Sequence, residues 1–446
     1  MQVPPKAYMA GKRITADMKY REAINFIDSS FVSFQTAGKE AYKEGLENIR
    51  LMMKHLGNPH RDYPVIHVAG TNGKGSFSHI LASVLQSAGY RTGLFTSPHL
   101  HEFRERMRID GVLIAEKEVA AFITENAATM KELELSYFEM TSAMAFDWFS
   151  KANVEVAVIE TGLGGRLDAT NIVLPELSVI TNIGLDHTDV LGNTLPAVAA
   201  EKGGIIKREI PLVIGERNAE TDPVFIRLAE ENCAEIIFAE DAYRITASQA
   251  FENYVRYTIE RVRDGRIESL DLDLHGSYQA KNIITARAAV HAMRHLTNLS
   301  ISSRALREGC RLVKQSTGLT GRWQIIGKEP LTVCDTGHNA HGLKYVTEQL
   351  KEYNYGKRYI VMGVSGDKQL SSILPLFPPD AYYIFTQADS PRACPAAELA
   401  RQANNFGLAG EVVPIVKDAL AKARSLASPE DMIFVGGSSF VVAEII

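Results

Sequence analysis

Hydrophobic residues are arranged in two alternating ways along the first part of the chain. Short runs that are mostly apolar alternate with longer segments in which apolar residues recur every three or four positions. The first pattern is typical of parallel strands buried on both faces, and the second of helices that cover a sheet. The predicted strands are Val65–Ala69, Thr92–Thr96, Val154–Ile159, Leu177–Thr181 and Pro211–Ile214, and the predicted helices between them include Lys117–Glu132 and Thr141–Lys151. We therefore predict an α/β domain with a mostly parallel sheet and crossover helices.

The pattern changes after residue 250. Residues 251–274 alternate apolar and polar side chains around Asp264-Gly265, which predicts an antiparallel hairpin. Helical segments and a linker at 315–321 precede a second alternation, which predicts a smaller Rossmann-like domain. Its predicted strands are Leu331–Cys334, Tyr359–Met362, Ala381–Phe385 and Met432–Val435, and its predicted helices include Leu343–Tyr353 and Ala396–Asn405. The predicted helices before the linker are Tyr278–Leu296 and Ser302–Lys314. The expected domains are 1–316 and 317–446.

A glycine-rich turn, VIHVAGTNGKGS at residues 65–76, connects the first predicted strand to a helical segment. Backbone N–H groups of such a turn bind an anion, Lys74 can reach the β- and γ-phosphates, and the Ser76 hydroxyl can contact magnesium. The spacing departs from GxxxxGK[ST], because Val68 replaces the first glycine and Gly75 separates Lys74 from Ser76. An ordinary turn is the alternative, but the strand before it and the helix after it favour a phosphate loop. The expected ATP-binding residues here are Asn72, Gly73, Lys74, Gly75 and Ser76.

Composition excludes several classes of protein. The chain has 446 residues, enough for two domains, and 46% of them are hydrophobic and 23% charged. A net charge of −5 without dense runs of Lys and Arg argues against nucleic acid as a partner. Cys233, Cys310, Cys334 and Cys394 show no paired spacing, so a reducing compartment is predicted, without a disulfide framework or zinc site. We find no signal peptide and no stretch long enough to cross a membrane, and expect a cytoplasmic monomer.

Eight motifs occur in an order and spacing that identify a family resemblance. They are GTNGKGS at 70–76, FTSPHL at 95–100, YFEMTSAMAF at 137–146, ETGLGGRLDATN at 160–171, DH at 186–187, EKGGIIK at 201–207, GRWQ at 321–324 and DTGHNAHG at 335–342. With them the chain resembles the folylpolyglutamate synthase/dihydrofolate synthase family of the Mur-ligase superfamily. The resemblance implies a P-loop central domain with a mostly parallel sheet and a small antiparallel β subdomain, followed by a smaller Rossmann-like C-terminal domain.

The same resemblance implies an ATP-dependent ligase of folate biosynthesis. A pteroate or folate carboxylate would take the γ-phosphoryl group of ATP, and the amine of L-glutamate would attack the resulting acyl phosphate. The acceptor would be dihydropteroate, a tetrahydrofolate (poly)glutamate, or both. An anionic carboxylate has no good leaving group, whereas an acyl phosphate supplies one once magnesium shields its charge.

The expected catalytic residues are Lys74, Glu160, His187, Lys202 and His338. Glu160 ends a predicted strand, where its carboxylate suits Mg²⁺, and the resemblance adds Ser97 and His187 as ligands, with two ions expected. A capping role is the alternative for Glu160 and Ser97, and a hydrogen-bonded structural role for His187, since magnesium prefers oxygen. Lys202 matches a lysine that the family often carries as a carbamate; a lysine paired with Glu201 or with a phosphate is the alternative.

The resemblance also assigns substrate contacts, each with a structural alternative. The aromatic rings of Tyr137 and Phe138 and the carboxylate of Glu139 suit a pterin. The alternative is that these residues start a helix and pack in the core. The resemblance implies that the pteroate-binding residues are Tyr137, Phe138, Glu139, Met140, Leu167, Asp168 and Ala169. It implies that the further ATP-binding residues are Asn282, Arg322 and Asp335, and that the glutamate-binding residues are His338, Asn339 and Ser438. Asp335 could instead cap a helix, and Ser438 could lie in a plain turn.

Two other functions remain as alternatives. A cell-wall Mur ligase acting on a UDP-sugar peptide would share the loop and the acyl phosphate, although we expect no additional N-terminal domain for a UDP group. A nucleotide-driven switch would bind ATP and change conformation without forming an amide. It would leave Arg322, Asp335 and His338 without an evident purpose.

Overall fold

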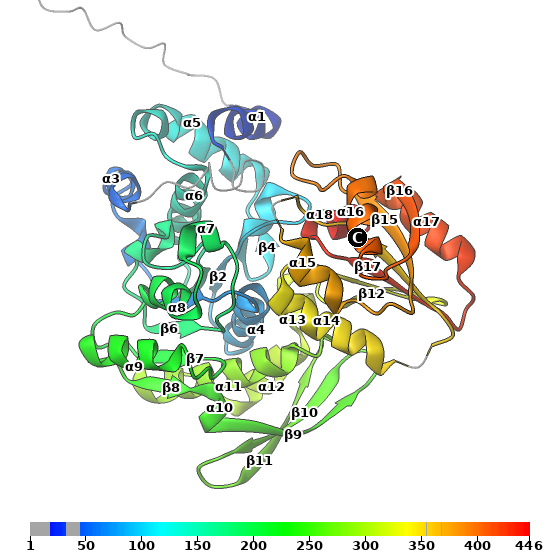
Figure 1. Ribbon diagram of the computed structural model, residues 1–446. Coiled ribbons are helices and arrows are strands. Elements are labelled where there is room, and N and C mark those ends of the chain that lie inside the picture. Colours follow the sequence, from blue (N-terminus) through cyan, green and yellow to red (C-terminus); the bar gives the residue numbers. More distant parts are fainter. Residues whose placement is uncertain (1–17, 33–44, 354, 367) are drawn as a thin grey trace, which may run out of the picture.

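The larger of two main sheets has eight strands and carries the glycine-rich loop (Figure 1). This computed structural model describes residues 18–32, 45–353, 355–366 and 368–446. The strand order is β4-β3-β2-β5-β1-β6-β7-β8. Its antiparallel pairs are β2–β3 and β3–β4, and the other pairs are parallel. The strands are β1 (Val65–Ala69), β2 (Thr92–Phe95), β3 (Met107–Ile109), β4 (Val112–Leu113), β5 (Val156–Glu160), β6 (Leu177–Ile180), β7 (Leu212–Ile214) and β8 (Ile236–Phe238). The predicted mostly parallel sheet is confirmed, with small differences at the strand ends.

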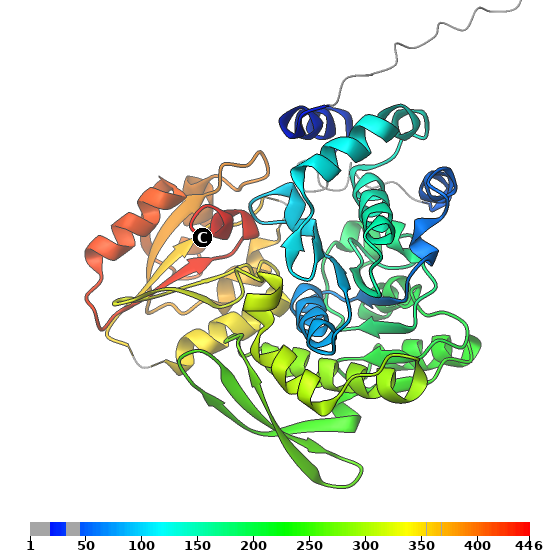
Figure 2. The same cartoon turned by 180° about the vertical axis from the view of Figure 1, so that it is seen from behind.

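Helices cover both faces of this sheet. Ile66 and Val68 of β1 pack on the side of α4 and α11, whereas Val65 packs in the core formed with α5 and α6. Seen from behind, α11 and α12 lie below α4, between it and the three-stranded sheet described next (Figure 2). The helices of this half are α1 (Tyr20–Ser30), α3 (Glu47–His55), η2 (Pro59–Arg61), α4 (Lys74–Ser87), η3 (Phe103–Arg106), α5 (Glu116–Glu132), α6 (Tyr137–Lys151), η4 (Ala169–Ile172), α7 (Thr188–Leu191), α8 (Leu195–Gly203), α9 (Asp222–Glu231), α10 (Ala239–Ala242), α11 (Gln279–Leu296), α12 (Ser303–Arg311) and α13 (Val313–Thr317).

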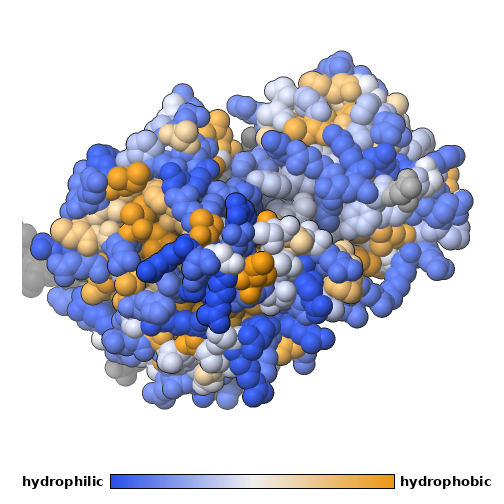
Figure 3. Space-filling view, turned by 90° about the horizontal axis from the view of Figure 1, so that it is seen from below, coloured by the Kyte–Doolittle hydropathy of each residue, from blue (hydrophilic) through white to orange (hydrophobic). Residues whose placement is uncertain are grey.

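The predicted hairpin is present as part of a three-stranded antiparallel sheet. Its order is β11-β10-β9, with β9 (Tyr243–Ala250), β10 (Val255–Arg261) and β11 (Arg266–Leu272). Tyr257, Ile259 and Leu270 are buried against α11 and α12, while most of β9 is exposed. From below, hydrophobic residues form separate patches among hydrophilic ones on this face of the molecule (Figure 3). Because β9 buries so few residues, its hydrophobic pattern does not predict a strand.

A six-stranded sheet forms the C-terminal half, in the order β12-β13-β17-β14-β15-β16 with only β12 antiparallel. Its two cores lie on opposite faces: α14 and α16 pack on one, and α17 and α18 on the other. The strands are β12 (Gln324–Lys328), β13 (Leu331–Asp335), β14 (Arg358–Met362), β15 (Tyr382–Gln387), β16 (Gly410–Ile415) and β17 (Met432–Gly436); the helices are α14 (Ala340–Glu352), α15 (Leu370–Ile373), η5 (Leu374–Leu376), α16 (Ala396–Asn404), α17 (Val416–Leu426) and α18 (Ser439–Ala443). The Rossmann-like arrangement is thus confirmed, with β12 and β16 added. The domain division at residue 317 stays a proposal.

Two helix predictions are wrong. The segment predicted as one helix over Ser302–Lys314 forms α12 and α13, and α13 continues to Thr317, inside the predicted linker. The second prediction is wrong for a clear physical reason. The helix expected from Thr141 begins at Tyr137, because Ser136 forms a capping box with Glu139. The Ser136 hydroxyl accepts the Glu139 N–H at 3.2 Å, and Oε2 of Glu139 accepts the Ser136 N–H at 2.7 Å.

Among the helices of the described residues, none is long and apolar enough to cross a membrane.

The core beneath α6 gives a stability prediction. Phe149 is fully buried beside Gly93 and its ring lies edge-on to Tyr63 at 6.2 Å, so Phe149→Ala should lower the free energy of unfolding by about 3–5 kcal/mol. Phe406, which is 38% exposed, is the control, and Phe406→Ala should change it by less than about 1 kcal/mol. Urea denaturation measures both. Equal effects of the two substitutions would contradict this account of the core.

Candidate active site

The phosphate loop joins β1 to α4 in a tight conformation that two glycines permit. Gly70 and Gly73 have φ values of +150° and +82°. A Cβ atom at Gly70 would lie 1.9 Å from Oγ1 of Thr181, and one at Gly73 would lie 2.4 Å from Oδ1 of Asn282. Both positions therefore require glycine for space as well as for backbone angle. Nζ of Lys74 folds back over the loop and donates to the Gly70 and Thr71 carbonyls at 3.0 and 3.3 Å.

A cleft of about 150 Å³ surrounds this loop. Every residue predicted to bind ATP lines it, together with candidate metal ligands and residues of the C-terminal half. The lining includes Asn72, Gly73, Lys74, Gly75, Ser76, Ser97, Glu160, Asn282, Arg322, Asp335 and His338. The cleft thus lies at the carboxyl ends of β1, β2 and β5, where ligands of open α/β sheets bind, and Arg322 and Asp335 close it from the second sheet.

Hydrogen bonds position several of these side chains. Gln279 donates to Oγ of Ser76 at 3.2 Å and accepts from Nδ2 of Asn282 at 2.8 Å. Oδ2 of Asp335 accepts from the hydroxyl of Tyr278 at 2.6 Å and from the N–H of Trp323 at 2.7 Å, while burial raises the pKa of the Asp335 carboxyl. Asp335 therefore organises the segment before β12 as well as lining the cleft.

Glu160 is the strongest candidate metal ligand in geometric terms. Its carboxylate is buried at the end of β5, accepts the Ser97 N–H at 3.3 Å and lies 4.0 Å from Nζ of Lys74. Burial raises its pKa to about 7 despite the nearby Lys74. A cation would stabilise this desolvated carboxylate, so the residues fit a magnesium ion.

Few protein side chains are available as ligands for this metal ion. Within the described ranges, no three His, Cys, Asp or Glu side chains gather closely enough to hold a metal. Ser97 lies beside Glu160 in the cleft, whereas His187, at the start of α7 with a φ of +50°, lines the neighbouring cavity. Such a set suits Mg²⁺, which keeps water and substrate phosphate oxygens among its ligands.

Lys202 lies under the loop. Its side chain is 4% exposed, and Nζ donates to the carbonyl of Gly70 at 2.9 Å, the same oxygen that Lys74 contacts. Burial, with a further contribution from Lys74, lowers the pKa of Lys202 to about 7. Glu201 pairs with Arg166 at 2.9 Å, so the alternative pairing of Lys202 with Glu201 has no support.

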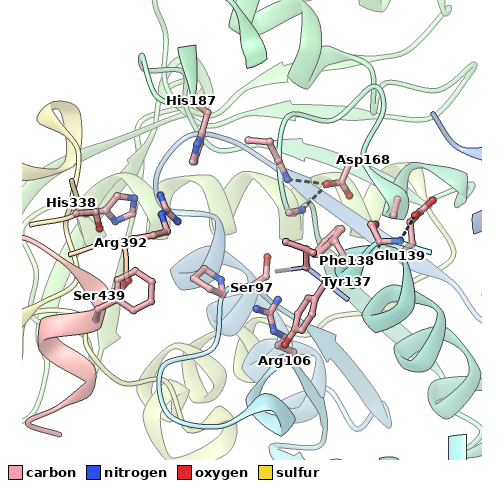
Figure 4. A pocket seen from close by; sticks show the side chains of 18 of the residues that line it. Ser97, Arg106, Tyr137, Phe138, Glu139, Asp168, His187, His338, Arg392 and Ser439 are labelled. Carbon is pink, nitrogen blue, oxygen red and sulfur yellow. Dashed lines mark hydrogen bonds between the residues drawn. The ribbon is translucent and has the colours of Figure 1, made fainter. Parts of the chain in front are cut away.

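A larger cavity of about 220 Å³ meets the cleft at Ser97, Pro98 and His338. Figure 4 shows Tyr137 and Phe138 at one end and His338, Arg392 and Ser439 at the other, with Ser97 between them. The predicted pteroate residues Tyr137, Phe138, Glu139, Leu167, Asp168 and Ala169 all line it, as do His187 and Ser438. The cavity is therefore elongated, aromatic at one end and polar at the other, and both halves of the chain contribute to it.

Three of the predicted pteroate residues differ from expectation. Met140 is fully buried in the core that α5 and α6 share and is not among the residues that line the cavity, so the cavity gives no support to its predicted pteroate contact. Glu139 lines the cavity, but its carboxylate is occupied by the helix cap. Asp168 accepts the N–H groups of Gly162 and Leu163 at 2.8 and 2.9 Å, which holds the loop after β5.

Of the predicted glutamate residues, His338 and Ser438 line the larger cavity, whereas Asn339 is buried and lines neither space. Ser438 caps α18 through the N–H of Phe440 at 3.3 Å and lines the cavity. Nδ1 of His338 lies 3.1 Å from the Thr336 carbonyl, and its ring lines both spaces. Asn339 caps α14 and contacts Asn72 of the loop.

Sequence reasoning missed four side chains of the larger cavity and its rim. Arg106 is buried with its guanidinium 5.2 Å from the centre of the Tyr137 ring, and Lys368 and Arg392 line the polar end. Asp186, next to His187, contacts Lys368 at 2.8 Å. Arg106 follows the FTSPHL motif and Asp186 belongs to the DH motif, which are signals that could have identified them; Lys368 and Arg392 lie outside all eight motifs.

Family models match most of the chain. A Mur ligase middle domain matches residues 68–290, and a Mur ligase glutamate ligase domain matches residues 321–439. A dihydrofolate synthase/folylpolyglutamate synthase of Bacillus subtilis is 32% identical over 91% of this chain and 95% of its own length. A probable bifunctional folylpolyglutamate synthase/dihydropteroate synthase of Haloferax volcanii is 33% identical over 96% of the chain, which spans 50% of that relative's length.

Solved structures agree in fold. Escherichia coli FolC in complex with DHPP and ADP has a TM-score of 0.82 at 30% identity, covering 96% of both chains. A bifunctional folylpolyglutamate synthase/dihydrofolate synthase with Mn, AMPPNP and L-glutamate bound has a TM-score of 0.78 at 29% identity, covering 91% of this chain and 94% of that one. Both structures hold a nucleotide, and the second also holds Mn.

The loop geometry predicts that Gly73→Ala weakens nucleotide binding. The new Cβ would lie 2.4 Å from Oδ1 of Asn282, so either the loop or the Asn282 side chain must move. Because both line the cleft, affinity for an ATP analogue should fall at least about tenfold. Gly57 is a matched control, since its φ of +84° is equally unusual but nothing lies within 4 Å of its Cβ position. Gly57→Ala should keep the affinity of the unmodified protein in isothermal titration calorimetry. Unchanged affinity in Gly73→Ala would contradict the assigned loop geometry.

Proposed function

We propose, since this chain belongs to the folylpolyglutamate synthase/dihydrofolate synthase family of Mur ligases, that it joins L-glutamate to a pterin-bearing carboxylate in an ATP-dependent reaction. The acceptor is dihydropteroate, a reduced folate, or both. The observation that carries the proposal is the meeting of the phosphate-loop cleft and the aromatic-ended cavity at Ser97, Pro98 and His338. A carboxylate held at this junction has the γ-phosphate on one side and the amine on the other.

The residues of the chain suit the two chemical steps. Loop N–H groups, Lys74 and Arg322 hold the triphosphate while an acceptor oxygen attacks the γ-phosphorus and ADP leaves. The amine of L-glutamate then attacks the acyl carbon, and phosphate leaves with one former carboxylate oxygen. His338 offers a ring nitrogen at the junction, where the attacking amine loses a proton.

Charge balance explains why cations surround the junction. Triphosphate, acceptor carboxylate and glutamate are all anionic, and they must lie within a few ångströms of each other. Lys74 and Arg322 on the nucleotide side, and Lys368 and Arg392 on the amine side, offset that repulsion. Magnesium, when bound, neutralises phosphate oxygens and stabilises the developing charge, and Glu160 with Ser97 would hold it. Two ions, with His187 as a further ligand, and a monomeric enzyme remain parts of the proposal.

The alternatives have less support. A cell-wall ligase would share the cleft, but the relatives that match over nine tenths of the chain are named for folate substrates. A nucleotide switch would not need the larger cavity, which residues of both halves line. The chain spans about half the length of two relatives that are named probable bifunctional folylpolyglutamate synthase/dihydropteroate synthases.

Incorporation of labelled L-glutamate tests the function. Purified protein with Mg-ATP should form an amide with dihydropteroate, tetrahydrofolate or both. Lys74→Ala should lower the rate by about 100-fold or more, because Lys74 lines the cleft where the proposed reaction places the transferred phosphoryl group. Lys117, whose side chain is 84% exposed, is the control, and Lys117→Ala should leave the rate unchanged. Absence of product with both acceptors, in protein that binds Mg-ATP, would reject the folate assignment.

Burial of Lys202 predicts a pH-dependent carbamate. The pKa of about 7 means that the amine is neutral above that pH and can attack CO₂, whereas below it the protonated amine is unreactive. Carbamylation should therefore fall as pH decreases through 7, and ¹³CO₂ labelling followed by ¹³C NMR should give a carbamate signal that Lys202→Arg lacks. A short carboxylic acid should partly restore activity to Lys202→Ala. No carbamate signal at pH 8 would leave Lys202 as a hydrogen-bond donor to Gly70.

A further inference from the structure

Asp186 is the point where one carboxylate of the N-terminal half contacts several groups of the C-terminal half. It lies between β6 and α7, and its side chain is only 12% exposed. Oδ1 accepts from Nζ of Lys368 at 2.8 Å, and Oδ2 accepts from Nδ2 of Asn339 at 2.9 Å. Nε2 of His338 lies 3.7 Å from Oδ2. The three partners come from two segments, before α14 and before α15, so one side chain holds both.

The phosphate loop connects to the same contact. Asn72 and Asn339 exchange amide hydrogen bonds, at 3.2 Å from Asn72 and 2.9 Å from Asn339. The side chain of Asn72 also lies 3.0 Å from Nδ1 of His341 in α14. A continuous series of polar contacts therefore leads from the loop through Asn339 to Asp186 and Lys368.

Burial makes this contact consequential. Lys368 is 13% exposed, so separating the two halves would leave a carboxylate and an ammonium group without their opposite charges until water reached them. Lys368 and His338 also line the polar end of the larger cavity, whereas Asp186 lines neither space. Asp186 can therefore act on the amine side of the reaction only through the residues that it holds.

We propose that Asp186 is a positioning residue that latches the two halves together and sets Lys368, His338 and Asn339 for the amine substrate. The inference rests on the proposed ligase function, which makes L-glutamate that substrate. Within the DH motif, His187 lines the cavity, whereas Asp186 lines neither space and holds Lys368. Oδ1 of Asp186 also accepts the His187 N–H at 3.0 Å.

The variant Asp186→Asn tests the latch, because it keeps the shape and an acceptor oxygen but removes the charge. The KM for L-glutamate should rise about tenfold or more, while affinity for a Mg-bound, non-hydrolysable ATP analogue stays within about threefold. Without ligands, small-angle X-ray scattering should show a larger radius of gyration than for the unmodified protein. Asp186→Glu, which keeps the charge, should restore part of the KM.

A second ion pair across the two halves provides the matched control. Glu252, before β10, pairs with Lys328 of β12 at 2.6 Å, but their side chains are 70% and 76% exposed. Glu252→Gln should change neither the KM nor the scattering, because exposed pairs contribute little. An equal effect of both substitutions would show that any charge lost at this boundary loosens the halves, and would overturn the specific role of Asp186.

The double variant Asp186→Asn/Lys368→Met decides whether Asp186 acts through Lys368. The effects on KM should be less than multiplicative, since removing Lys368 already releases its partner. Multiplicative effects, or a loss of ATP-analogue affinity in Asp186→Asn, would overturn the proposal, the latter by placing Asp186 on the metal side. If the unmodified protein forms no amide, the ligase function fails, and the scattering comparison still tests the latch.

Discussion

The close packing around Gly70 of the phosphate loop is the constraint on which the site depends. Two lysine side chains, Lys74 and Lys202, donate to the single carbonyl of Gly70, and its Cα approaches Thr181 so closely that no side chain fits. The loop therefore brings two ammonium groups together at the end of β1. Burial of Lys202 lowers its pKa to about 7, so this amine is mostly neutral above that pH.

The same arrangement explains why two sheets are needed. The first sheet places the loop, Glu160 and Ser97 at neighbouring strand ends, where they can hold a nucleotide and a cation. In the proposed reaction the amine attacks from the larger cavity, and His338 and Ser438, next to strands of the second sheet, line that cavity. The polar contacts between the halves are thus part of the site's construction, because neither half alone encloses the junction.

Local patterns predicted much of this arrangement. The phosphate loop, the parallel strands and the strand-end position of Glu160 depend on residues close in sequence, and the structure has them in place. Met140 belongs to the YFEMTSAMAF motif, but a motif does not state which of its side chains face a cavity, and here Met140 lies in the core. The sequence did not predict strand β9, because most of its side chains are exposed and give no pattern of buried positions.

The parts that sequence could not predict are contacts between distant segments. Lys368 lies in an irregular stretch, and only the folded chain brings it 2.8 Å from Asp186. Arg392 likewise reaches the cavity from a loop without periodicity. The roles of the candidate ligands and substrate contacts stay predictions.

The central claim is that the acceptor carboxylate is phosphorylated at the junction of the two spaces before the amine attacks. An acceptor labelled with ¹⁸O in its carboxylate, incubated with ATP, Mg²⁺ and L-glutamate, tests this directly. One labelled oxygen should appear in each inorganic phosphate released and the other should remain in the amide, as measured by mass spectrometry. Amide formation with unlabelled phosphate would contradict the account, because the carboxylate oxygen would then have left without passing to phosphorus.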